Sequence, residues 1–168
     1  MVGFFKSKQN SNVVFDDAYI ALRKQAFVVE PAQIGITLDT NEQVYGAVVD
    51  MGVSQTDIAT MVCFLDGAAS LYFSNGGGII GAGQHENVKQ AAALYLTGLQ
   101  KLLSIMQLTD DFSTAPTEDH HIFYLLTGNG IYSYDLNINE SQRSKDNQLL
   151  FSLTQMVLTE IRQASSRK

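Results

Sequence analysis

A cluster of glycines in the middle of the chain constrains the fold more than any other feature of the sequence. Six of the thirteen glycines lie between Gly67 and Gly83. Glycine inside an extended segment commonly marks a bulge or the close approach of another backbone. If residues 78–83 form a strand, Gly77, Gly81 and Gly83 share one face that carries almost no side chains. We therefore expect another part of the protein to pack closely against that face.

Apolar periodicity along the chain predicts an α+β fold. Alternating apolar residues indicate strands, and apolar residues spaced three and four apart indicate amphipathic helices. The sequence thus predicts an antiparallel sheet of about five to six strands, with three helices packed mainly on one face. The strands are expected at residues 33–38, 44–53, 58–65, 69–73 (continued by 78–83), 121–126 and 131–136, and the helices at 16–27, 86–106 and 146–164.

Local patterns add detail to this prediction. An Asn-Gly pair at 129–130, between two apolar runs that contain aromatic residues, is a strong hairpin signal. Asp16 or Asp17 is expected to cap the first helix, and Asp146 the last. The strand at 44–53 has one cleaner apolar face, which we predict to be its core face and which carries Tyr45, Ala47, Val49 and Met51.

A chain of 168 residues favours a single domain. We expect this domain to span residues 15–164, after a flexible tail at 1–14 and before a frayed end at 165–168. The order helix, strands, helix, strand pair, helix resembles that of profilin- and roadblock-type domains, with one hairpin more than a roadblock domain has. This resemblance concerns the order of elements alone and implies no function.

Positive charge is missing from two long stretches of the sequence. No Lys or Arg occurs between Lys24 and Lys89 or between Lys101 and Arg143, and the net charge is −6. Nucleic acids and anionic membranes attract proteins through Lys and Arg, so neither is an expected partner. The chain also lacks an apolar run of about 20 residues and a signal-peptide core, so we expect a soluble, cytoplasmic protein.

The glycine cluster invites a phosphate-binding interpretation, but the surrounding residues disfavour it. Gly76, Gly78 and Gly81 have the spacing of a dinucleotide-binding loop, yet no Lys or Ser/Thr stands where a Walker-type loop needs one. Glu86 would also occupy the positive end of the following helix. We therefore favour a structural turn with close packing over a ligand contact or a nucleotide loop.

The other chemistry-bearing residues form no complete motif. His85 is not part of a zinc-binding helix motif, and the adjacent His120 and His121 point to opposite faces of a strand. Cys63 is the single cysteine and lies in an apolar run, so a buried and unreactive thiol is expected, without a disulfide. We predict no metal, no cofactor and no catalytic residue.

Two functional hypotheses follow. The favoured one is a small interaction or structural module without evident catalytic chemistry, whose partner is another protein or a second copy of the chain. An uncovered edge strand could add a partner strand, and a cationic partner surface would suit the acidic loops. The alternative is a small-molecule-binding or enzymatic domain with a pocket at residues 74–85. The residues assigned to ligand or partner binding are Tyr72, Asn75, Gly77, Gly81, Gly83, Gln84 and His85.

Overall fold

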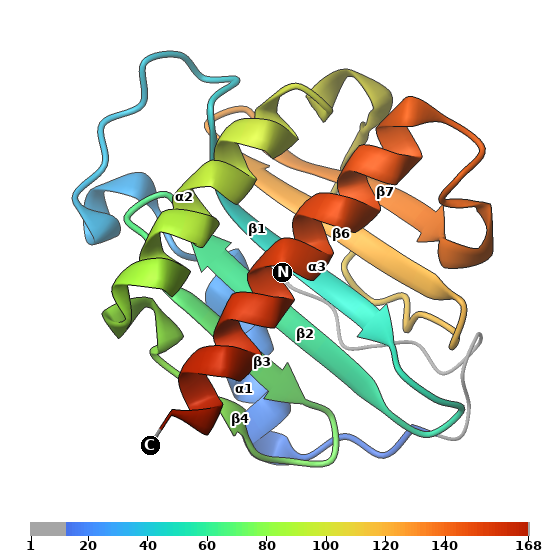
Figure 1. The fold of residues 1–168 in the computed structure, drawn as a ribbon. Coiled ribbons are helices and arrows are strands. Elements are labelled where there is room, and N and C mark those ends of the chain that lie inside the picture. The colour runs from blue at the N-terminus through green and yellow to red at the C-terminus, as the bar shows by residue number, and fades with distance from the viewer. Residues whose placement is uncertain (1–12, 168) are drawn as a thin grey trace.

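The computed structural model describes residues 13–167, and a seven-stranded antiparallel sheet lies at its centre (Figure 1). The strands follow the order β4-β3-β2-β1-β6-β7-β5. The predicted α+β class with an antiparallel sheet is confirmed, with seven strands in place of five to six. The strands are β1 Val44–Gly52, β2 Ile58–Phe64, β3 Ala69–Phe73, β4 Gly78–Ile79, β5 Gln107–Thr109, β6 His120–Thr127 and β7 Gly130–Asn137.

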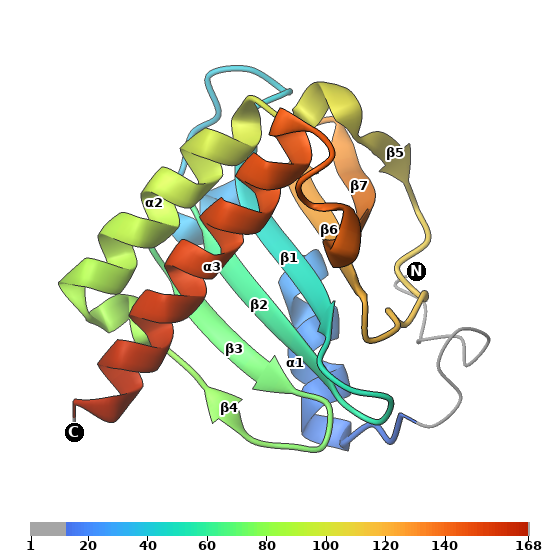
Figure 2. The same cartoon turned by 45° about the vertical axis from the view of Figure 1, so that its right-hand side comes forward.

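Helices cover both faces of the sheet. The helices α2 (Glu86–Gln100) and α3 (Lys145–Ser166) lie side by side on one face, which we call the α2/α3 face (Figures 1 and 2). The helix α1 (Asp17–Phe27) packs on the opposite face, which we call the α1 face. Two of the three helices therefore share a face, and α1 closes the core beneath the sheet.

The α2/α3 face holds the larger apolar core. At Gly98 on α2, an added Cβ would stand 2.7 Å from Leu153 Cδ1 on α3, so this glycine allows the two helices to approach. The contact offsets the cost of glycine in a helix, which is about 1 kcal/mol relative to alanine. The residues of α2 that are spaced three and four apart are buried here, namely Val88, Ala92, Tyr95 and Leu99.

The central strand β1 is buried on both faces. Ala47, Val49 and Met51 contribute to the core on the α2/α3 face, as predicted, and Val48 to the core on the α1 face. The prediction for Tyr45 was wrong, since this side chain packs in the core on the α1 face. The pairing of β1 with β6 shifts between residues 44 and 46, and a β-bulge there inverts the alternation of side chains.

Three predicted elements differ from the structure. Residues 33–38 form no strand, because a short 3-10 helix, η1 (Pro31–Ile34), ends at Gly35 with a left-handed φ of 71°. Proline at the start of a helix and glycine at its end outweigh the short apolar run. After the turn at 74–77 the extended segment is only β4, and η2 (Ala82–Gln84) follows. The helix α2 ends at Gln100 instead of 106, and the chain turns through η3 (Leu103–Ile105) toward β5.

The predicted C-terminal hairpin and one of the two predicted helix caps are present in the structure. The hairpin of β6 and β7 is confirmed, and Asp16 caps α1 as predicted. Ser144 caps α3 in place of Asp146, because its Oγ accepts a hydrogen bond from Asn147 N at 3.0 Å. A short 3-10 helix, η4 (Ile138–Glu140), joins β7 to α3. Residues 1–12 of the predicted N-terminal tail lie outside the described residues.

Candidate functional site

The glycine-rich segment, by which we mean residues 76–83, covers the β3 edge of the sheet. Gly81 N donates a hydrogen bond to Ser70 Oγ of β3 at 3.1 Å. A Cβ at Gly78 would overlap Leu71 O, and a Cβ at Gly83 would overlap Gly67 O. The backbone of the segment thus lies against the outer side of β3, which is the close approach that the sequence indicated.

The three glycines that were predicted to share a bare face have different roles. Gly83 is packed against backbone, as expected. A Cβ added at Gly77 would have no atom within 4 Å. A Cβ added at Gly81 would have its nearest neighbour, Gln84 Nε2, at 3.6 Å, which is an ordinary contact. Both instead adopt positive φ, 81° at Gly77 and 71° at Gly81, a conformation that favours glycine. The prediction of one shared face was wrong, because the left-handed turn and η2 interrupt the strand.

The predicted binding residues are only partly brought together. Gly81, Gly83 and Gln84 line an open hollow of about 260 Å³ with Asp66 and Lys89. The side chain of His85 lines a separate hollow with Glu160 and Arg167, and Tyr72 is buried on the α1 face. Asn75 and Gly77 are exposed at the turn. Small-molecule sites usually measure about 300–1,000 Å³ and enclose most of the ligand, so this hollow is smaller than expected for one.

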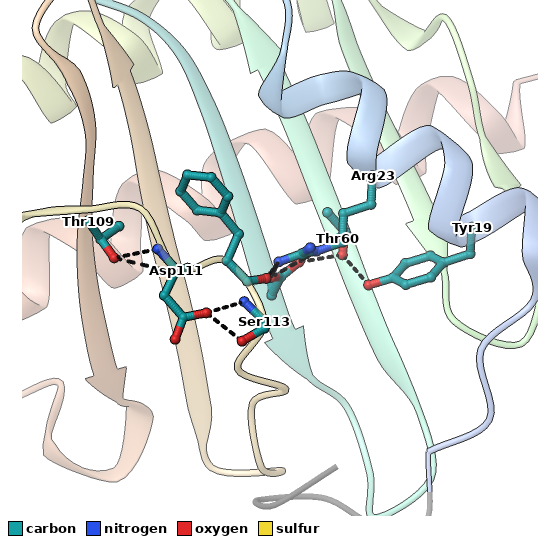
Figure 3. A network of polar contacts seen from close by, with 8 residues as sticks. Tyr19, Arg23, Thr60, Thr109, Asp111 and Ser113 are labelled. Atoms are coloured by element: carbon teal, nitrogen blue, oxygen red, sulfur yellow. Dashed lines mark hydrogen bonds and ion pairs between the residues drawn. The ribbon is translucent and has the colours of Figure 1, made fainter. Parts of the chain in front are cut away.

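A buried polar network lies on the α1 face, where α1, β1 and β2 meet (Figure 3). Arg23 Nη2 of α1 donates to Asp50 Oδ2 of β1 at 2.7 Å, and Arg23 Nε lies 3.1 Å from Oδ1. Thr60 Oγ1 of β2 donates to Asp50 Oδ1 at 2.6 Å and also contacts the Tyr19 hydroxyl at 2.6 Å. The four residues are at most 3% exposed.

The same arginine connects α1 to the loop after β5. Arg23 Nη2 donates to Phe112 O at 2.7 Å, and the guanidinium lies 4.8 Å from the ring centroid of Phe27. The rings of Phe27 and Phe112 stack with centroids 4.5 Å apart. Asp111 shapes this loop, because its N bonds Thr109 Oγ1 and its Oδ1 accepts from Ser113 N and Oγ (Figure 3).

This network acts as a structural connection rather than a reaction centre. Burial, with the nearby Asp50 carboxylate, raises the pKa of Tyr19 far above its ordinary value, so the phenol stays neutral and serves as a hydrogen-bonding group. Substrate cannot reach groups that are this deeply buried. Only part of the network leaves a signal in the sequence. Asp50 is the one charged residue of an apolar strand, and Arg23 follows Tyr19 by one helical turn.

Two further buried side chains on the α2/α3 face, a thiol and an imidazole, can titrate. Cys63 is fully buried, and burial raises the pKa of its thiol to about 12, which agrees with an unreactive thiol. His121 is 6% exposed, and its Nδ1 has no hydrogen-bond partner within residues 13–167. Burial and the neighbouring His120 lower the pKa of His121 to about 4, so the ring is neutral at pH 7.

The two edges of the sheet differ in how they are covered (Figure 2). At the β5 edge, β5 pairs only with residues 131–133 of β7, although β7 continues to Asn137. Within residues 13–167, no strand pairs with the outer side of Tyr134–Asn137. Leu108 in the middle of β5 is 61% exposed. We call β5 and the outer side of Tyr134–Asn137 the open edge, and it is the candidate functional site.

A protein-family scan, a search of curated proteins and a search of solved structures each found no match to this chain. Across residues 13–167, no three His, Cys, Asp or Glu side chains are arranged to hold a metal ion. In the same part of the chain, no helix is long and apolar enough to cross a membrane.

Proposed function

We propose that this protein is an interaction module that binds an extended segment of another protein at its open edge. The observation that carries the proposal is the asymmetry of the sheet. The glycine-rich segment covers the β3 edge, whereas at the other edge the outer side of half of β7 has no strand partner in the described residues. An uncovered edge presents unpaired N–H and C=O groups that can pair with a new strand.

The side chains at the open edge support this proposal. Tyr132 and Tyr134 are partly exposed on the α2/α3 face of β7, and Leu108 lies opposite Tyr132 in the pairing of β5 with β7. Tyr134 is held in place by a hydrogen bond of 2.7 Å from its hydroxyl to Asn147 Oδ1. Aromatic and leucine side chains beside a free strand edge give an added strand both backbone bonds and side-chain contacts. The reducing cytoplasm, which fits a lone buried thiol, is the compartment we propose.

The alternative function, a small-molecule or enzymatic site at residues 74–85, has the hollow beside Gly81, Gly83 and Gln84 in its favour. Thermal-shift screening against nucleotides, metals and metabolites tests it. A ligand-dependent rise in melting temperature, abolished by Gln84→Ala, would favour this alternative. Melting temperatures that stay constant across the panel would favour the interaction module.

The interaction module is tested by selecting random ten-residue peptides for binding to the full chain. Leu108→Ser is compared with Leu94→Ser, a matched control, because Leu94 on α2 is 62% exposed and Leu108 61%. We expect Leu108→Ser to lower the affinity for the selected peptides about ten-fold, because about 1.4 kcal/mol of apolar contact is lost. Leu94→Ser should change the affinity little. Equal effects of the two variants, or a selection that returns no binder, would contradict the proposed function.

A further inference from the structure

We propose that the segment bound at the open edge alternates apolar and cationic residues. This inference rests on the proposed function and specifies its partner. It follows from the two sides of the open edge, which differ in chemistry. Successive side chains of a strand point to opposite faces of a sheet, so an added strand would place every second side chain on each of these sides.

The side that belongs to the α2/α3 face is apolar. Tyr132 and Tyr134 pack against the core on this face. Leu108 is paired with Tyr132 and therefore lies on the same side of the sheet. A strand added beside Tyr134 would extend this surface, and apolar side chains would fit there because they would cover the exposed parts of the two tyrosines and the leucine.

The opposite side carries negative charge. Asp135 is paired with Ile122, which packs on the α1 face, and its side chain is 50% exposed while it contacts His120 Nδ1 at 2.6 Å. The His120 partner of this carboxylate is itself 32% exposed, so the pair lies at the surface. Residues 102–142, which include β6 and β7, contain no Lys or Arg.

Cationic side chains on this side of the added strand would therefore face Asp135. An exposed pair of opposite charges contributes about two- to five-fold in affinity. A second copy of the chain fits less well, because pairing two open edges would bring like charges together on molecules that each carry a net charge of −6. The added segment is thus best supplied by a different, basic protein.

Three ten-residue peptides with the same apolar residues at alternate positions test the inference. The intervening positions are all Lys, all Ser or all Glu, and affinities are measured by fluorescence anisotropy with the full chain at 50 and 300 mM salt. At 50 mM salt we expect the Lys peptide to bind about two- to five-fold more tightly than the Ser peptide, and the Glu peptide more weakly than both. The Lys advantage should shrink at 300 mM salt, because exposed charges are screened.

Two variants assign the effect to the open edge. Asp135→Asn should reduce the Lys advantage about two- to five-fold and leave the affinity of the Ser peptide unchanged. Asp66→Asn is the matched control in the turn between β2 and β3, where an asparagine oxygen can still accept the bond from Ala68 N, and should change neither affinity.

The outcomes separate this inference from the proposed function. Equal binding of the three peptides, weakened by Leu108→Ser, would overturn the cationic preference and leave the interaction module intact. Binding of none of the peptides, together with an empty peptide selection, would overturn both. Concentration-dependent dimerisation in sedimentation experiments that is abolished by Leu108→Ser would identify a second copy as the occupant and would also overturn the inference.

Discussion

Arg23 on α1 and Asp50 on β1 form an ion pair of 2.7 Å that is buried beneath the sheet. Arg23 is 3% exposed and Asp50 is 0% exposed. Each member of the pair makes a further hydrogen bond: Thr60 donates to Asp50, and Arg23 donates to Phe112 O. It connects α1 and the loop after β5 to the central strand, and this loop joins β5 at the open edge to β6. The loop after β5 therefore connects the buried Arg23–Asp50 pair to the open edge.

Removing one member of the buried pair should destabilise the protein strongly. We expect Arg23→Met to lower the free energy of unfolding by about 3–5 kcal/mol, because the Asp50 carboxylate would remain buried without its counterion. The double variant Arg23→Met, Asp50→Leu should lose less, since no charge is then left uncompensated. Urea unfolding followed by circular dichroism measures both. A loss below about 1 kcal/mol for Arg23→Met would contradict a structural role for the pair.

Acid should destabilise the protein through His121. The pKa of His121 is about 4 in the folded protein and the ordinary value is 6.5, so the unfolded chain binds more protons between these two pH values. The free energy of unfolding should therefore decrease as the pH falls from about 6.5 to 4, by up to roughly 3 kcal/mol from this one group. Well above pH 6.5 the ring is neutral in both states, and there its contribution does not change with pH.

His121→Phe isolates this contribution, because a phenyl ring can stack on Phe151, whose ring centroid lies 6.2 Å from the imidazole. Unfolding free energies measured between pH 7 and pH 4 should decrease less steeply in this variant than in the parent. His85→Asn, which removes an exposed histidine, serves as the control. A His121→Phe curve parallel to that of the parent would show that His121 does not set the acid sensitivity.

Two glycines of the glycine-rich segment should respond differently to substitution. At Gly83 the limit is space, so Gly83→Ala and Gly83→Asn should both cost about 1–3 kcal/mol or more. At Gly81 the limit is the φ of 71°, so Gly81→Ala should cost roughly 1–2 kcal/mol and Gly81→Asn less, because asparagine tolerates the left-handed conformation better. Thermal unfolding measures these differences. If asparagine were less destabilising than alanine by the same amount at both positions, the steric explanation for Gly83 would be contradicted.

The sequence predicted the elements whose signals are local. The Asn-Gly pair predicted the hairpin of β6 and β7, and helical periodicity predicted α2. The strand β5 was missed because three residues are too few for a periodic pattern, and only its pairing with β7 defines it. Tyr45 was assigned to the wrong face because a bulge depends on the partner strand.

The candidate site was harder to predict than the fold. The glycine-rich segment was identified as a close contact, and that is confirmed at Gly83. The binding role that we assigned to its neighbours stays a prediction, since Tyr72 and His85 lie apart from the hollow that Gln84 lines. The Arg23–Asp50 pair joins residues 27 positions apart, which periodicity cannot detect. The open edge follows only from the order of strands.

The most direct test of the account is amide hydrogen exchange at the open edge, measured by NMR with and without the alternating Lys peptide. We predict that, between Tyr134 and Asn137, every second amide exchanges rapidly in the free protein and becomes protected in the complex, because alternate residues of a strand turn their N–H groups outward. The amides of β4 should not change. Protection confined to α2, α3 or the glycine-rich segment, with the amides of β7 unchanged, would contradict strand addition at this edge.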